Sequence, residues 1–170
     1  QKVFRTVDIS NITSDNNLKI LQNDENIVGT VVTKIAYNDE RDQDGAFIQA
    51  IFWAYYSTIS MFSVAKDVLL IDATYKINQF SMPLIVICAI DQFGSTYPLA
   101  FALVYSETYE FYYWVMRQLS QTLTKLIGDA QVSTFITDQE LALMAAISLV
   151  FPHARHQLCI WHIFKNIRNK

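Results

Sequence analysis

The chain alternates between apolar runs and short polar turns, and the length and period of each run predict its secondary structure. Short, β-branched or alternating runs predict strands over 30–37, 46–56, 68–75, 83–90, 97–105, 132–137 and 155–161. Apolar positions at i, i+3, i+4 and i+7 predict a helix over 111–126, and shorter helices are expected over 58–65 and 141–151. Strands therefore dominate the first two thirds of the chain, and helices and strands alternate after them.

The turns between strands 68–75, 83–90 and 97–105 are so short that these strands must pair as antiparallel hairpins. The helix over 111–126 supplies the crossover that a parallel return requires, so strand 132–137 is expected beside strand 68–75 and parallel to it. The predicted fold is α/β (α+β), with a mixed five-stranded sheet in β-β-β-α-β-α-β order and flanking helices. This order is the ribonuclease H-like layout.

Length and composition predict one globular domain. The 170 residues are 52% hydrophobic, and no apolar run approaches the roughly 20 residues of a membrane helix. Residues 1–29 are polar and are expected to be a linker or the tail of a preceding domain, and residues 30–170 form the predicted domain. Because the chain begins without Met, we expect it to be part of a longer protein. Two cysteines are too few for a disulfide framework.

The net charge of −3 argues against a large surface that follows nucleic-acid phosphates. The charge is uneven, however: from His153 to the end the charged side chains are Arg155, Lys165, Arg168 and Lys170, with no acid. Any basic surface is therefore expected at this end of the chain.

Asp72 follows the aliphatic run Val68-Leu69-Leu70-Ile71, which predicts a strand covered on both faces. A carboxylate there is costly unless it is paired, protonated or bound to a metal. One alternative is a structural salt bridge to Lys76 or Arg155. The sequence therefore gives Asp72 a chemical or electrostatic role that a strand alone does not explain.

Asp138 ends the strand expected beside that of Asp72. Two neighbouring carboxylates repel unless a cation bridges them or one is protonated, and such hard oxygen ligands suit Mg²⁺ or Mn²⁺. The alternative is a helix cap, because Thr137-Asp138-Gln139-Glu140 before an apolar helix is typical of a capping box. Considered together, Asp72 and Asp138 favour a metal site.

Four potential zinc ligands, His153, His156, Cys159 and His162, occur three residues apart. Pro152 and the alternation that follows it favour a strand, on which residues three apart point to opposite faces. We therefore do not expect all four to bind zinc, and a Cys-x-x-His half-site alone is a weak signal.

Three motifs resemble the Mutator-like element (MULE) transposase domain. They are Asp72-Ala73-Thr74-Tyr75-Lys76-Ile77-Asn78, Thr137-Asp138-Gln139-Glu140-Leu141-Ala142-Leu143 and Arg155-His156-Gln157-Leu158-Cys159-Ile160-Trp161-His162, in the family's order and spacing. The segment 46–54, with its Phe-Trp-Ala, also resembles the strand that precedes the first aspartate of the family. The resemblance covers about residues 45–170.

The resemblance implies a DDE-type, ribonuclease H-like enzyme that cleaves and joins DNA at terminal inverted repeats in the nucleus, with two Mg²⁺ or Mn²⁺ ions. Asp72 and Asp138 would be the first two catalytic acids and metal ligands, and Cys159 and His162 the family's C-x-x-H motif, whose role does not follow from the resemblance. The third acid, a Glu, is expected on a later helix beyond Lys170. Glu107 or Glu110 could add a carboxylate, as in ribonuclease H, but their place at the start of the predicted helix is explained more simply by complementarity to the helix dipole. A homo-oligomer is compatible with this activity, and no membrane association is implied.

Three other functions are consistent with parts of the pattern. A domesticated relative, like the far-red-impaired-response transcription factors, would keep the fold as a DNA-binding regulator without catalysis. A ribonuclease H-like nuclease acting on RNA–DNA hybrids fits less well, because it explains neither the Cys-x-x-His nor the Trp-containing strand. A purely structural domain leaves Asp72 unexplained.

Overall fold

The computed structural model describes residues 19–20, 29–37, 46–63, 67–74, 81–128 and 131–168. The expected linker, residues 1–29, lies outside this part of the chain except for Gly29 and a two-residue strand, β1 (Lys19–Ile20). The elements after β1 are β2 (Gly29–Tyr37), β3 (Ala46–Tyr55), α1 (Tyr56–Phe62), β4 (Val68–Thr74), β5 (Leu84–Ile90), β6 (Thr96–Val104), α2 (Tyr109–Ile127), β7 (Thr134–Thr137), α3 (Leu141–Val150), β8 (Arg155–Leu158) and α4 (Ile160–Arg168).

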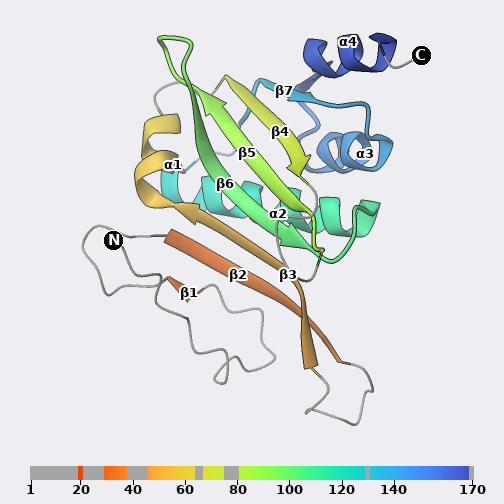
Figure 1. Cartoon of the computed structure of the whole chain (residues 1–170). Helices are drawn as coiled ribbons and strands as arrows, with labels where there is room; N and C mark the ends of the chain where they lie inside the picture. The colour runs from red at the N-terminus through yellow and green to blue at the C-terminus, as the bar shows by residue number, and fades with distance from the viewer. Residues whose placement is uncertain are drawn as a thin grey trace, which may run out of the picture.

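The described strands form one mixed sheet in the order β1-β2-β3-β6-β5-β4-β7-β8 (Figure 1). A mixed α+β domain was predicted and is confirmed, but the expected five-stranded sheet is too small, because the sheet has eight strands. The additional strands join where β3 pairs antiparallel with β6. Ala50, Phe52 and Ala54 of β3 are buried, so this pairing extends the apolar face of the sheet.

β4 lies between neighbours of opposite direction. It pairs antiparallel with β5 and parallel with β7, and β8 pairs parallel with β7 at the edge of the sheet. The crossover from β6 to β7 is α2, whose C-terminus is closed by Gly128 at φ +75°, as a glycine at this position predicts. The carboxyl ends of β4 and β7 therefore meet at the same end of the sheet (Figure 1).

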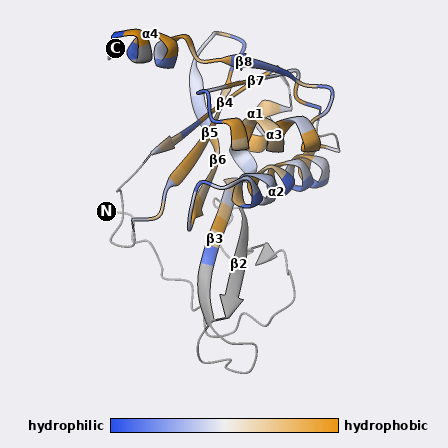
Figure 2. Cartoon of the chain, turned by 90° about the vertical axis from the view of Figure 1, so that its right-hand side faces the viewer, coloured by the Kyte–Doolittle hydropathy of each residue, from blue (hydrophilic) through white to orange (hydrophobic). Residues whose placement is uncertain are grey.

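Helices α1, α2 and α3 lie on one side of the sheet, and α4 lies on the other side, at the end where β4 and β7 finish (Figure 2). Leu69 and Ile71 of β4 belong to the core on the helix side, where they are 0% and 3% exposed. On the opposite face Val68 and Leu70 are half-buried and Asp72 is exposed. The prediction of a strand covered on both faces was therefore wrong for the described part of the chain.

A row of side chains crosses this second face. The strand registers place Trp53 beside Phe101, Phe101 beside Val86, and Val86 beside Asp72. The rings of Trp53 and Phe101 stack, with centroids 5.3 Å apart. Asp72 thus ends a row of otherwise apolar residues at the accessible end of the sheet.

The last predicted strand, over 155–161, is correct only in its first half. β8 ends at Leu158, and the amide of Ile163 donates to the carbonyl of Cys159 at 3.1 Å, which begins α4. The apolar side chains after residue 159 alternate briefly but also fit a helical repeat, so short-range alternation was misleading. No helix among the described residues is long and apolar enough to span a membrane.

Candidate active site

Asp72 and Asp138 come to the same end and the same face of the sheet. The parallel register pairs Val68 with Thr134 and Leu70 with Ile136, and two more residues along each strand lead to Asp72 and Asp138. Side chains alternate faces along a strand, so both aspartates share the face opposite α1–α3. The sheet therefore supplies two carboxylates from adjacent strand ends.

The Asp72 side chain is 60% exposed and lies next to α4. Its Oδ1 is 3.7 Å from Nε2 of His162, whose side chain is 22% exposed. This distance is within ion-pair range but too long for a direct hydrogen bond. The expected partners are not found: Arg155 makes no ion pair with Asp72, and Lys76 lies outside the described residues.

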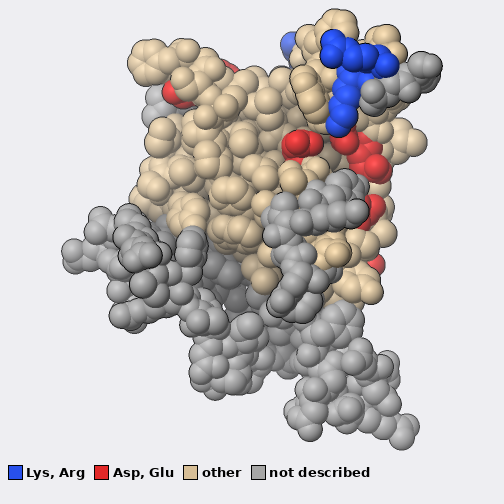
Figure 3. Space-filling model, in the orientation of Figure 1, with Lys and Arg blue, Asp and Glu red and all other residues tan. Residues whose placement is uncertain are grey.

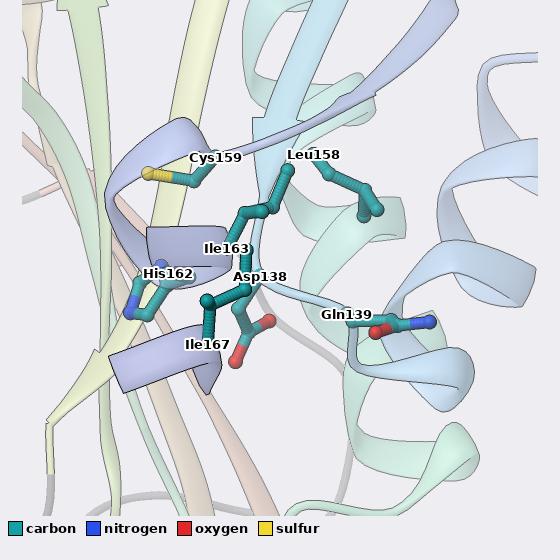
Figure 4. A pocket seen from close by; sticks show the side chains of 7 residues that line it. All are labelled: Asp138, Gln139, Leu158, Cys159, His162, Ile163 and Ile167. Carbon is teal, nitrogen blue, oxygen red and sulfur yellow. The ribbon is translucent and has the colours of Figure 1, made fainter. Parts of the chain in front are cut away.

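Asp138 lines a pocket of about 190 Å³ between the end of β7 and the first two turns of α4 (Figure 4). The other lining residues are Gln139, Leu158, Cys159, His162, Ile163 and Ile167. Apolar side chains of α4 thus form one wall, and the carboxylate of Asp138 and the imidazole of His162 belong to the same pocket. The contact of His162 with Asp72 connects both aspartates to this site.

Asp138 is not the cap of α3. The N-cap is Glu140, whose Oε1 accepts a hydrogen bond of 3.1 Å from the amide of Ala142. The alternative interpretation of Asp138 as a capping residue is therefore wrong, because a neighbouring carboxylate has that role. Among the described residues no hydrogen bond or ion pair involves the carboxylate of Asp138, so it is available to a ligand.

Glu107, one of the two glutamates considered as a further carboxylate, lies just before α2. Glu107 is half-buried and accepts a hydrogen bond of 2.6 Å from the hydroxyl of Tyr112. Burial, this hydrogen bond and the negative charges of Glu107, Glu140 and Asp138 raise the pKa of Tyr112. Glu107 is therefore engaged by Tyr112, whereas Glu110 is exposed in the first turn of α2.

The three histidines and Cys159 separate into two groups. His153 is exposed in the turn after α3, and His156 is half-buried with its Nε2 2.8 Å from the hydroxyl of Thr137. Burial lowers the pKa of His156. Cys159 and His162 line the same pocket, contrary to the expectation of opposite faces, because they lie one helical turn apart and not on a strand.

Among the described residues no three His, Cys, Asp or Glu side chains form a group that could by itself hold a metal ion. These residues therefore do not form a structural zinc site, which needs four protein ligands. Mg²⁺, in contrast, binds through one or two carboxylates and keeps several waters. Asp72 and Asp138 provide two such carboxylates beside solvent, so their chemistry fits Mg²⁺ or Mn²⁺ with water completing the coordination.

The charges around the pocket have opposite signs. Lys and Arg side chains gather over α4, and acidic side chains lie next to them at the same end of the sheet (Figure 3). The basic residues of α4 include Lys165 and Arg168, and Nζ of Lys165 lies 4.8 Å from the ring centroid of Trp161. A polyanion could thus contact α4 while a cation occupies the carboxylates.

Two polar groups, Tyr112 and Cys88, could not be recognised from the sequence pattern. Tyr112 contacts Glu107 across the beginning of α2, and Cys88 of β5 is close enough to Asp72 for that charge, together with burial, to raise the pKa of the thiol. Both side chains appear apolar in their helix and strand patterns. Only the packing of α2 and β5 against the strand ends reveals their polar neighbours.

Comparison with known proteins identifies the family. The sequence profile described as the MULE transposase domain matches residues 68–166, which include β4, β7 and α4 and therefore Asp72, Asp138, Cys159 and His162. The chain belongs to the MULE transposase domain family.

Several curated proteins are similar to the chain. The PKS-NRPS hybrid synthetase cheA of Chaetomium globosum is 32% identical over 118 residues, which are 69% of this chain and 2% of that protein. Protein FAR1-RELATED SEQUENCE 5 of Arabidopsis thaliana is 30% identical over 120 residues, 71% of this chain and 15% of that protein. Protein FAR1-RELATED SEQUENCE 6, also of Arabidopsis thaliana, is 30% identical over 128 residues, 75% of this chain and 17% of that protein. The chain thus spans a small part of each relative.

Proposed function

We propose that this chain is the core of a DDE-type DNA transposase that cleaves a DNA strand at the ends of an element and transfers the freed 3′ end to target DNA. The observation that carries the proposal is the pair Asp72 and Asp138, which the parallel register of β4 and β7 brings to one end and one face of the sheet. Membership of the MULE transposase family supports the same activity.

The strand arrangement supports a ribonuclease H-like core. Three antiparallel strands, β6, β5 and β4, are followed by two parallel strands, β7 and β8, and α2 makes the crossover. The β1–β2–β3 extension is added at the β6 edge, away from β4 and β7. This arrangement supports assigning Asp72 and Asp138 to the first two acid positions of the proposed DDE triad.

Each aspartate has a distinct environment in the proposed reaction. Asp72 and Asp138 would hold Mg²⁺ or Mn²⁺, which when bound lowers the pKa of a water and stabilises the charge on a leaving oxygen during phosphoryl transfer. Asp72 is exposed and can meet a DNA phosphate from the open face of the sheet, whereas Asp138 lies in the pocket under α4. The third acid of the triad is proposed to lie beyond residue 170.

DNA would approach along α4. Lys165 and Arg168 lie in its last turn, and Trp161 is exposed beside Lys165. Basic side chains bind phosphates and aromatic rings stack on unpaired bases, so this combination suits a DNA end more than a protein partner. The proposal also includes a nuclear location, where the DNA of the element would be, and a homo-oligomer would allow two element ends to be joined together.

The proposal is tested with the full-length protein and DNA carrying the element's terminal repeats. Asp72→Asn and Asp138→Asn should each abolish strand cleavage with Mg²⁺ or Mn²⁺ while circular dichroism and the unfolding midpoint stay unchanged. Asp91→Asn is the matched control, because Asp91 accepts hydrogen bonds from Phe93 and Ser95 in the β5–β6 turn. Cleavage that persists in both catalytic variants would refute the assignment.

A second candidate is a DNA-binding regulator without catalysis. Two of the relatives named above are FAR1-RELATED SEQUENCE proteins, which supports this candidate. The described residues bring together two of the three acids that catalysis would need, Asp72 and Asp138, and Glu107 is hydrogen-bonded to Tyr112. This function predicts that the wild-type protein binds DNA but does not cleave it with either metal. A DNA-binding measurement alongside the cleavage assay distinguishes the two, because only the transposase loses an activity in Asp72→Asn.

A further inference from the structure

The first turn of α4 is attached to both strands that carry the aspartates. The amide of Cys159 donates to the carbonyl of Thr137, the last residue of β7, at 2.6 Å. One helical turn later, Nε2 of His162 faces Oδ1 of Asp72 at 3.7 Å. The spacing Cys-x-x-His therefore has a geometric meaning, since residues three apart on a helix project on the same side.

The surroundings of His162 select its tautomer. Nδ1 is buried and has no hydrogen-bond partner among the described residues, while Nε2 faces the carboxylate. Nδ1 has no partner in either tautomer, so the carboxylate decides: an N–H of Nε2 directed at it is favourable, whereas a lone pair of Nε2 directed at it would be repelled. The neutral imidazole is therefore expected to carry its proton on Nε2, as a donor toward Asp72.

Packing fixes this imidazole in place. Trp161 contacts the ring edge-on, with centroids 4.8 Å apart and an interplanar angle of 82°. Ile163 and Ile167 of the same helix line the adjoining pocket (Figure 4). Asp72 itself is 60% exposed, so its carboxylate would otherwise rotate freely at the end of β4.

We propose that His162 is a positioning residue for Asp72: from the first turn of α4, which Cys159 attaches to β7, its imidazole lies 3.7 Å from one oxygen of the Asp72 carboxylate, biases the orientation of that carboxylate through the Nε2–H dipole, and leaves the other oxygen free for the cation shared with Asp138. This role rests on the proposed metal site of Asp72 and Asp138, and it assigns a function to the C-x-x-H motif without making His162 a metal ligand. Groups that orient a ligating side chain typically change metal affinity by about 10-fold or more when removed.

The tautomer is tested first, without metal. Long-range ¹H–¹⁵N NMR of the three histidine rings should show His162 as the Nε2–H form at a pH where it is neutral. Asp72→Ala should shift the Nε2 resonance of His162, whereas Asp67→Ala, at the other end of β4, should not. An Nδ1–H tautomer, or a resonance unaffected by Asp72→Ala, would overturn the proposal.

Metal affinity is tested second, by electron paramagnetic resonance with Mn²⁺ alone on the same chain. His162→Phe keeps the ring but removes the donor, and should weaken Mn²⁺ binding about 10-fold. His162→Gln restores an N–H at a similar reach and should bind Mn²⁺ nearly as well as wild type, and His153→Phe, in the exposed turn, is the matched control. Equal affinities for wild type and His162→Phe, or equal losses in His162→Phe and His162→Gln, would contradict the role.

The two arms separate this inference from the function on which it rests. If the wild-type chain binds no Mn²⁺ but His162 is the Nε2–H tautomer and responds to Asp72→Ala, the contact between the two side chains stands and the metal site fails. If Mn²⁺ binds and the tautomer is Nδ1–H, the metal site stands and the positioning role fails.

Discussion

Glu140 accepts a hydrogen bond from the amide of Ala142, so Glu140 and not Asp138, two residues earlier, caps α3. Because Glu140 caps α3, Glu140→Ala should destabilise the protein by about 1 kcal/mol. Asp138→Asn removes no hydrogen bond found in the described part of the chain, so its stability should equal that of wild type. Urea unfolding of both variants provides the comparison, and a larger loss in Asp138→Asn than in Glu140→Ala would restore the capping interpretation.

Tyr112 and Glu107 form the second contact that can be tested by stability. Tyr112 is 1% exposed and donates to Glu107 at 2.6 Å. Tyr112→Phe leaves the half-buried carboxylate without this donor and should cost about 1–3 kcal/mol in the free energy of unfolding.

The matched control is Tyr113→Phe, whose hydroxyl lies 3.4 Å from Arg117 at the surface and should change stability by less than about 0.5 kcal/mol. In a double-mutant cycle with Glu107→Ala, which removes the acceptor, the two losses should not add, because each variant breaks the same hydrogen bond. Additive losses would show that the hydrogen bond contributes nothing.

His156 should make the stability of the protein depend on pH. Burial lowers its pKa below the ordinary value of 6.5, so the unfolded chain binds more protons than the folded chain between the lowered pKa and 6.5. Stability should therefore rise with pH through this interval and fall as the solution becomes acidic. Urea midpoints measured from about pH 5 to about pH 8 should depend less on pH in His156→Gln than in wild type.

His153→Gln, which removes an exposed histidine, should keep the wild-type pH profile. The opposite pattern, with the dependence lost in His153→Gln and kept in His156→Gln, would contradict the assignment to His156.

DNA binding should depend on Lys165 in a salt-sensitive manner. Lys165 lies over the exposed ring of Trp161 on α4, and if it contacts a phosphate, Lys165→Gln should weaken binding and reduce the slope of log affinity against log salt by about 1. Lys125→Gln, in the last turn of α2, is the control and should leave the slope unchanged. Fluorescence anisotropy over a range of salt concentrations measures both, and an equal slope for Lys165→Gln and wild type would exclude this phosphate contact.

The sequence predicted the elements well where periodicity and turn chemistry agree. The strands that become β4, β5 and β6 and the helix that becomes α2 were placed within a few residues, because each apolar run is bounded by turn residues or a helix-ending glycine. The failure at the end of β8 arose because four residues of alternation cannot distinguish a strand from the start of an amphipathic helix.

The candidate site was predicted in part. The order of elements was enough to bring Asp72 and Asp138 to adjacent strand ends, because crossover rules leave few arrangements. The environment of Asp72 could not be predicted, since an aliphatic strand has the same sequence whether one face or both are covered. The contacts of Asp72 with His162 and of Glu107 with Tyr112 depend on the angle and packing of α4 and α2, which no local pattern specifies.

β4 pairs with β5, which is close in sequence, and with β7, which is distant in sequence, and this difference sets the order in which the site can form during folding. The β4–β5 pairing closes a short loop, whereas the β4–β7 pairing must wait for β6 and the whole of α2. Longer loops cost more entropy to close, so we expect amides of β5 to gain protection in pulsed hydrogen exchange before those of β7. Asp138 then reaches Asp72 only after most of the sheet has formed. The repulsion between the two carboxylates therefore opposes the late pairing of β4 with β7 and not the earlier steps of folding.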